Sequence, residues 1–178
     1  MNILTYSLIF IAIIALSRYL TTKSNKPALV VSGGRILKAD KVLGYMGFLS
    51  ILLGTVFPVL YYIDVYNRDT KFLIASIFML VIFSLIGLYM VLYYKNTRVE
   101  FNETMVKSTN FLGNSKKINW SDIKNIKYLA TAKWLSLRNG VIKVNVPVIL
   151  KGFGQFKKEL TEKVSTEKYQ EAFSKLNL

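Results

Sequence analysis

Hydrophobic and polar residues are segregated along this chain into three long apolar runs and a mixed tail. Residues 1–17, 42–63 and 72–94 contain no charged side chain, and the third run, FLIASIFMLVIFSLIGLYMVLYY, holds 14 Leu, Ile, Phe or Val residues. As a helix rising ~1.5 Å per residue, this run covers roughly 34 Å, slightly more than the hydrocarbon core of a bilayer. Its large apolar side chains favour insertion by roughly 4–8 kcal/mol. The pattern therefore predicts transmembrane helices at about 1–20, 42–63 and 72–94.

The first run has a second interpretation, as a secretory signal peptide. Ala15 and Ser17 have the small side chains that a signal peptidase accepts. However, no Lys or Arg precedes the apolar run, whereas a signal peptide begins with a basic segment. We therefore expect this run to be retained as the first of three spans.

The tail, residues 95–178, has the alternation typical of short β-strands, followed by helical spacing. The Asn139-Gly140 pair predicts a hairpin with a two-residue turn, in which both residues adopt a positive φ. From about residue 152 the apolar positions recur at helical spacing, which predicts a helix that breaks near Ser165. The alternating stretches predict six strands, at about 98–102, 104–109, 116–120, 124–129, 133–138 and 141–146.

Two stretches of this tail resemble bacterial pleckstrin-homology-like domains. The segment INWSDIKNIKY, residues 118–128, is similar to the place where a strand of that fold ends and the chain turns into the next sheet. The segment LRNGVIKVNVPVILKGFGQFKKEL, residues 137–160, is similar to its final hairpin, linker and capping helix. The resemblance covers roughly residues 98–165 and implies an antiparallel β-sandwich or barrel closed by a helix. The predicted architecture is thus a membrane domain with three transmembrane α-helices, residues 1–94, followed by an α+β pleckstrin-homology-like domain, residues 95–178.

The distribution of Lys and Arg between the loops predicts the orientation in the membrane. Residues 18–41 hold six Lys or Arg, while residues 64–71 hold two. Short loops rich in Lys and Arg stay in the cytoplasm, so loop 18–41 is predicted to be cytoplasmic. Three spans then place the amino terminus outside the cell membrane and the carboxy-terminal domain in the cytoplasm.

The residues that are missing exclude several function classes. The chain contains neither Cys nor His, which removes disulfides, thiolate nucleophiles and the commonest general base and metal ligand. The predicted spans hold no charged residue that could line an ion or substrate pathway. Trp120 is expected in the core, and Glu159 and Glu162 are expected to be solvated among lysines. The sequence thus predicts a protein that is not an enzyme and has no cofactor or metal.

The excess of basic residues indicates an anionic partner. Residues 95–178 carry 16 Lys or Arg against seven acidic residues, and each cation near an anionic leaflet contributes roughly 1 kcal/mol. Nucleic acid attracts the same charge, but the chain has no nucleic-acid recognition motif, so we expect an anionic lipid bilayer and no nucleic acid. The candidate membrane-surface contacts are the basic residues of the first loop and the compact pairs of the tail: Arg18, Lys23, Lys26, Arg35, Lys38, Lys41, Lys116, Lys117, Lys157 and Lys158.

These features together predict a bacterial membrane-tethered protein. It would present a basic pleckstrin-homology-like module at the inner leaflet, dock a protein partner and contact anionic lipid weakly. A homo-oligomer is compatible with the same features. Two alternative functions also fit: immunity against a membrane-active bacteriocin, and an accessory subunit of a transporter. All three require only apolar spans and a basic domain, so the sequence does not separate them.

Overall fold

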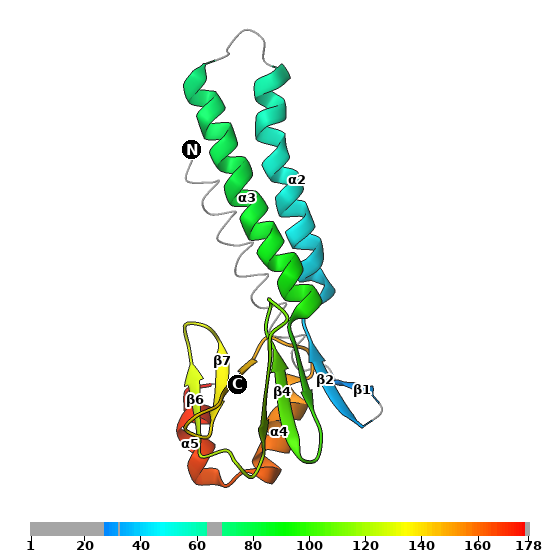
Figure 1. The fold of residues 1–178 in the computed structure, drawn as a ribbon, viewed down its shortest axis with the longest axis vertical. Helices are drawn as coiled ribbons and strands as arrows, with labels where there is room; N and C mark the ends of the chain where they lie inside the picture. The colour runs from blue at the N-terminus through cyan, green and yellow to red at the C-terminus, as the bar shows by residue number, and fades with distance from the viewer. Residues whose placement is uncertain (1–26, 32, 64–68, 177–178) are drawn as a thin grey trace. The chain divides into compact units, whose positions relative to one another are not determined.

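The computed structural model describes residues 27–31, 33–63 and 69–176, and these fall into two compact units. The helical unit comprises residues 41–97 and 111–113, and the strand-rich unit comprises the other described residues (Figure 1). The predicted first span, at about 1–20, lies outside the described residues. So do three of the candidate contacts, Arg18, Lys23 and Lys26.

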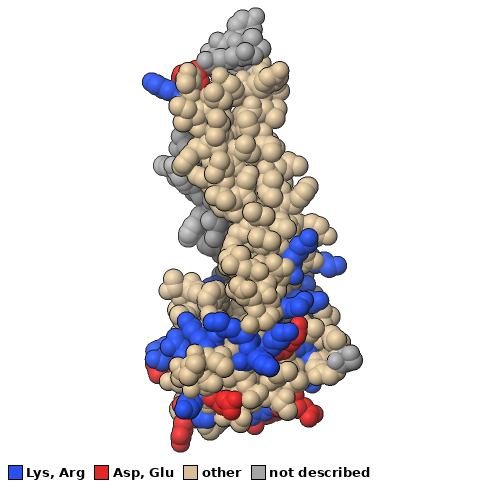
Figure 2. All heavy atoms as spheres, in the orientation of Figure 1, with Lys and Arg blue, Asp and Glu red and all other residues tan. Residues whose placement is uncertain are grey.

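Two long helices form most of the helical unit, α2 at Lys41–Ile63 and α3 at Thr70–Asn96. Both are long and apolar enough to cross a membrane, in agreement with the spans predicted at 42–63 and 72–94. Their charged residues, Lys41, Lys71 and Lys95, all lie near helix ends. Figure 2 shows the resulting contrast between almost uncharged helices and a strand-rich unit with many Lys and Arg, and some Asp and Glu, on the face in view. Many large apolar side chains of both helices are exposed, as in helices that are apolar all round and contact lipid.

Small residues let the backbones of α2 and α3 approach closely. A Cβ atom added at Gly47 would lie 2.7 Å from the carbonyl oxygen of Gly87, and one added at Gly54 would lie 2.9 Å from the Cβ of Phe83. Ser50 adds an interhelical hydrogen bond, because its Oγ donates to the carbonyl oxygen of Phe83 over 3.0 Å. The glycines of α2 therefore serve packing within the chain, a common use of small residues in membrane helices.

The strand-rich unit contains two antiparallel sheets. One has five strands in the order β1-β2-β3-β4-β5, and the other has three in the order β6-β7-β8. The six strands predicted in the tail are confirmed as β3 to β8, to within two residues at each end. The bounds of all eight are Leu29–Val31, Gly34–Lys38, Arg98–Phe101, Met105–Thr109, Ser115–Asn119, Asn125–Leu129, Trp134–Arg138 and Lys143–Pro147.

Strands β1 and β2 are absent from the prediction, which assigns every residue up to 94 to a membrane domain. In the structure β2 pairs with β3, with Lys38 opposite Arg98, so residues 29–38 belong to the sheet. The helices α2 and α3 are thus inserted between two neighbouring strands of one sheet. The local pattern of residues 27–40 does not reveal this, because the partner strand lies about 60 residues further along the chain.

Two helices follow the second sheet, α4 at Phe153–Lys163 and α5 at Thr166–Ser174. They confirm the helix predicted from about residue 152 and its break near Ser165. The spacing of the apolar residues in α4 is helical, so that they form one buried stripe. This stripe faces the core of the strand-rich unit.

Aromatic rings from distant segments meet in that core. The ring of Phe156 lies 5.3 Å from the ring of Phe101 and 5.7 Å from the ring of Trp120, measured between centroids. Trp120 is only 5% exposed and Phe156 is fully buried. The prediction that Trp120 belongs to the core is therefore confirmed.

The turn between β7 and β8 differs from the predicted two-residue turn. Arg138 pairs with Lys143, so four residues separate the last paired positions. The Asn139 Oδ1 accepts hydrogen bonds from the backbone N–H groups of Val141 and Ile142. Gly140 has the predicted positive φ, 103°, but Asn139 does not. The side chain of Asn139 thus organises a longer turn.

Candidate functional site

A cleft of about 620 Å³ lies in the strand-rich unit between the β1–β2 hairpin, the β3–β4 connection and α4. Val30 and Arg35 line it from the hairpin, Glu103 and Thr104 from the connection, and Glu159 from the helix. Three segments that are far apart in the sequence therefore build it. Their side chains give it an apolar part and a charged part.

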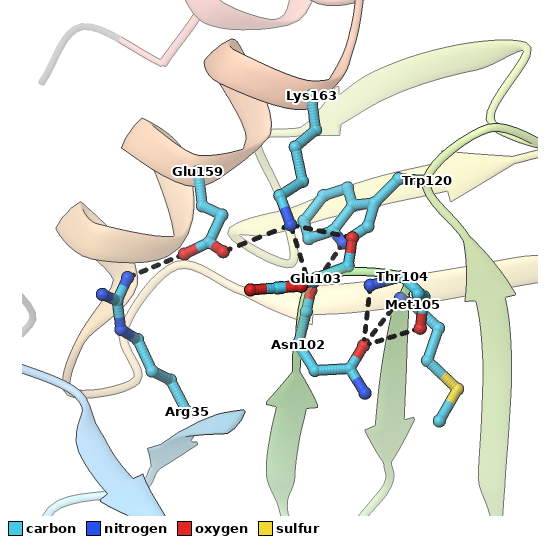
Figure 3. A network of polar contacts seen from close by, with 8 residues as sticks. All are labelled: Arg35, Asn102, Glu103, Thr104, Met105, Trp120, Glu159 and Lys163. Carbon is cyan, nitrogen blue, oxygen red and sulfur yellow. Dashed lines mark hydrogen bonds and ion pairs between the residues drawn. The ribbon is translucent and has the colours of Figure 1, made fainter. Parts of the chain in front are cut away.

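Glu159 is the centre of a polar network at this cleft (Figure 3). Its carboxylate lies 2.7 Å from the guanidinium of Arg35 and 3.5 Å from the ammonium of Lys163. The Glu159 side chain is only 16% exposed, so two cations balance a partly desolvated charge. The expectation that Glu159 is solvated is therefore wrong. Its partner Arg35 lies 124 residues earlier, and only the fold brings the two together.

Lys163 also holds the β3–β4 connection in place. Its ammonium donates to the carbonyl oxygen of Glu103 over 2.8 Å and lies 5.8 Å from the centroid of the Trp120 ring. The Trp120 Nε1 donates to the carbonyl oxygen of Asn102 over 2.9 Å, and the Asn102 Oδ1 accepts from the backbone N–H of Met105 over 2.8 Å. These bonds fix the shape of the cleft wall (Figure 3).

Strand β1 is an exposed apolar edge beside the cleft. Leu29, Val30 and Val31 are 55%, 82% and 46% exposed, and among the described residues β1 pairs only with β2. The backbone N–H of Ala28 donates to the side-chain oxygen of Gln155 in α4 over 2.8 Å. The beginning of the strand is thus attached to the body of the unit, and its outer edge has no partner strand in the part of the chain that the structure describes.

The two edges of the five-stranded sheet differ in character. Exposed edge strands usually carry charged side chains, which discourage pairing with another chain. The last strand, β5, follows this rule with exposed Lys116 and Lys117. The three residues of β1 are all apolar. The edge at β1 is therefore the one suited to accept a further strand.

A smaller hollow of about 150 Å³ adjoins the cleft at the β1–β2 hairpin. The two hollows share Val31, Gly34 and Arg35, whereas Ile36 and Met105 line only the smaller one. Because successive side chains of a strand point to opposite faces, a strand added to β1 would place side chains on both faces of the sheet beside these hollows.

The candidate membrane contacts of the first loop separate in the structure. Arg35 belongs to the cleft through its ion pair with Glu159, whereas Lys38 ends β2 and Lys41 begins α2. The prediction omits two further cations, Lys95 in the last turn of α3 and Arg98 opposite Lys38. Their position directly after the predicted third span could have identified them.

The candidate contacts of the tail lie apart from these residues in the sequence and on different elements. Lys116 and Lys117 are adjacent on β5, and Lys117 lies opposite Lys107 of β4. Lys157 and Lys158 are on α4, but the ammonium of Lys157 lies over the ring of Phe173, 4.9 Å from its centroid. The seven described candidate contacts thus lie on four elements, β2, α2, β5 and α4.

The segment that leads into α2 is fixed by Lys151. The Lys151 ammonium lies 2.8 Å from the carboxylate of Asp40, whose side chain is 4% exposed. The backbone N–H of Lys151 donates to the carbonyl oxygen of Lys38 over 2.9 Å. The chain therefore leaves the strand-rich unit from a defined position.

Within the described part of the chain, no group of three or more His, Cys, Asp or Glu residues is arranged to hold a metal ion. Comparison with known proteins finds no protein family, curated protein or solved structure that matches this chain.

Proposed function

We propose that this chain is a membrane-anchored docking protein. In this proposal α2 and α3 cross the cell membrane, and the strand-rich unit binds an extended segment of a partner protein along β1. The proposed role is binding and not catalysis. The chain has neither His nor Cys, and the partly buried acid of the cleft, Glu159, is paired with two cations.

The strand-rich unit is proposed to be pleckstrin-homology-like. Strands β2 to β5 and β6 to β8 give four and three antiparallel strands, and α4 follows the last of them. This order resembles the seven strands and closing helix of that fold. Strand β1 would then be an addition to its edge, and α2 and α3 an insertion between its first two strands.

The insertion supports a simple membrane topology. Strands β2 and β3 pair with each other, and each continues into a long apolar helix through only one or two residues. If both helices cross the bilayer, residues 38 and 98 must lie on the same side. The four cations that flank the helices at this end are Lys38, Lys41, Lys95 and Arg98, which favours the cytoplasmic side and contact with anionic lipid.

The observation that carries the docking proposal is the outer edge of β1, which pairs with no further strand among residues 27–31, 33–63 and 69–176. Addition of a strand to an exposed edge gains affinity from main-chain hydrogen bonds and specificity from pockets for alternate side chains. Strand β1 offers an apolar edge beside two adjoining hollows. The partner segment is therefore expected to be extended and apolar on both faces where it pairs.

Photo-cross-linking in native membranes tests this proposal. A benzophenone side chain is introduced at Leu29, at Val31 or, as a control, at Val141, which is 96% exposed in the β7–β8 turn. We expect the two β1 positions to cross-link to the same partner protein, and the control position to give no adduct with it. Because Leu29 and Val31 are two residues apart on the same face, the cross-linked position in the partner should shift by two residues between them.

Two outcomes would contradict docking at β1. One is adducts at Val141 as abundant as those at β1. The other is cross-linked positions that scatter over the partner without the two-residue shift. A Val30→Lys substitution adds a charge of the kind that protects β5, and it should remove the β1 adducts while leaving membrane insertion unchanged.

A further inference from the structure

The tip of the connection between β4 and β5 belongs to the helical unit. Residues 111–113 group with α2 and α3, although both flanking strands are in the strand-rich unit. The Phe111 ring meets the Tyr89 ring edge to face, with centroids 5.2 Å apart. The side-chain amide of Asn96 donates to the carbonyl oxygen of Phe111 over 2.8 Å. The tip is thus attached to the carboxy-terminal part of α3.

This connection has a polar neck and an apolar tip. At the neck, the backbone N–H of Asn110 donates to the carbonyl oxygen of Asn114 over 3.0 Å, and the N–H of Asn114 donates to the Asn110 Oδ1 over 2.9 Å. At the tip, Gly113 has a φ of 88°, a conformation that few residues other than glycine adopt. Leu112 is 62% exposed there.

The position of Tyr89 along α3 indicates how deep the tip lies in the bilayer when α3 spans it. The helix has 27 residues and is about 40 Å long, close to the thickness of a bilayer with its headgroups. Tyr89 precedes the last helical residue, Asn96, by seven positions, or about 10 Å. In a spanning α3, Tyr89 lies near the boundary between headgroups and hydrocarbon, where aromatic residues are enriched.

We propose that residues 111–113 insert into the interfacial layer of the bilayer, with Leu112 against lipid. This inference rests on the proposed membrane-spanning role of α3. The lipid is identified as the occupant because the tip contacts α3 at Tyr89, and Leu85 and Leu88, about one turn or less before Tyr89, are 62% and 50% exposed. Apart from its two connections to the helices, the strand-rich unit thus has a third attachment to the membrane.

The absence of cysteine from the chain allows a direct test with single labels. The full-length variants L112C, L85C and V141C are labelled with the environment-sensitive fluorophore NBD and reconstituted into phosphatidylcholine–phosphatidylglycerol vesicles. Quenching is then measured with lipids that carry a nitroxide at the headgroup, at a shallow acyl carbon or at a deep acyl carbon. All three positions are exposed apolar residues, so the labels perturb packing little.

We expect the label at residue 112 to be quenched at least twofold more by the headgroup and shallow nitroxides than by the deep nitroxide. The label at residue 85 should be quenched most by the deep nitroxide, and the label at residue 141 by none. If residue 112 behaves like residue 141, or is quenched most by the deep nitroxide, the interfacial insertion is wrong while the spanning role of α3 stands. If residue 85 is not quenched, the spanning role itself fails.

Discussion

Arg35 and Glu159 form a 2.7 Å ion pair across 124 residues of sequence, and it joins the β1–β2 hairpin to α4. Lys163 contacts the same carboxylate. The pair therefore links the proposed docking edge to the helix that covers the core. Its removal should loosen the edge without unfolding the unit.

The substitution Glu159→Gln tests this link. We expect a loss of about 0.2–1 kcal/mol, the usual range for an exposed ion pair, which corresponds to amide exchange in β1 and β2 that is faster by up to roughly 5-fold. Hydrogen exchange of the full chain in detergent, followed by mass spectrometry, measures it.

Glu171→Gln is the matched control. Lys175 donates to the Glu171 carboxylate over 2.6 Å and lowers the pKa of that carboxyl, but both side chains are largely exposed. This control should leave exchange in β1 and β2 unchanged. Equal effects of the two substitutions would show that the Arg35–Glu159 pair does not hold the hairpin.

The substitution Gly47→Leu should separate α2 from α3. Even a Cβ at this position would meet the carbonyl oxygen of Gly87 at 2.7 Å, and overpacking typically costs about 1–3 kcal/mol. Thermal melting of the helical circular-dichroism signal in detergent should therefore shift to lower temperature. Thr55→Leu, an exposed position of the same helix, should melt like the unmodified chain. A Gly47→Leu variant with unchanged melting would contradict the close contact.

Truncation of Phe156 should unfold much of the strand-rich unit. Phe156 is fully buried between Phe101, Trp120 and Phe153, and Phe→Ala substitutions in cores cost about 3–5 kcal/mol. Urea unfolding followed by Trp fluorescence should show a large loss for Phe156→Ala. Phe173→Ala removes the same atoms from a half-buried ring and should cost clearly less. If Phe173→Ala lowered the stability more than Phe156→Ala, the core would not be centred on Phe156.

Reporter fusions can establish the sidedness of the two units. Reporters placed at Gly33 and after Leu178 should both be active in the cytoplasm, because β1 and β2 are in the same sheet as β3 to β5. A reporter at Asp69, in the loop between α2 and α3, should be active on the opposite side. If Gly33 and Leu178 report different sides, the two helices do not form a spanning hairpin.

The cations next to the helices should determine this orientation. Neutralising all four flanking cations should produce a mixed or inverted topology, because Lys and Arg near span ends set the orientation. The same fusions measure the result. The four substitutions are Lys38→Gln, Lys41→Gln, Lys95→Gln and Arg98→Gln.

A control variant removes the same amount of charge from exposed positions distant in sequence from the helix ends. It should keep the normal orientation, and a comparable inversion would show that net charge alone decides the topology. Its four substitutions are Lys124→Gln, Lys127→Gln, Lys143→Gln and Lys158→Gln.

Much of the secondary structure follows from local patterns. The uninterrupted apolar runs predict α2 and α3, and alternation predicts the six strands β3 to β8. The helical spacing after residue 152 and the break near Ser165 also appear in the structure. These features are predictable because apolar periodicity depends on residues a few positions apart.

Other features depend on residues that are distant in sequence. Strands β1 and β2 gain their place in the sheet from β3, which follows after both helices. The sequence predicts Glu159 to be a solvated helix residue, because its partner Arg35 is distant in sequence. The sequence gives no sign that the loop at Phe111 packs on a helix, because its partners Tyr89 and Asn96 lie outside the loop.

The sequence alone thus determined which segments are apolar helices, which are strands of the tail, and where the cations lie along the chain. Only the tertiary structure decided that α2 and α3 interrupt a sheet, that β1 is the edge strand of the described sheet beside a cleft, and that a loop between strands belongs to the helical unit. The physical reason is that side-chain periodicity is a local property, whereas strand pairing, ion pairs and ring contacts form between segments that meet only after the chain has folded.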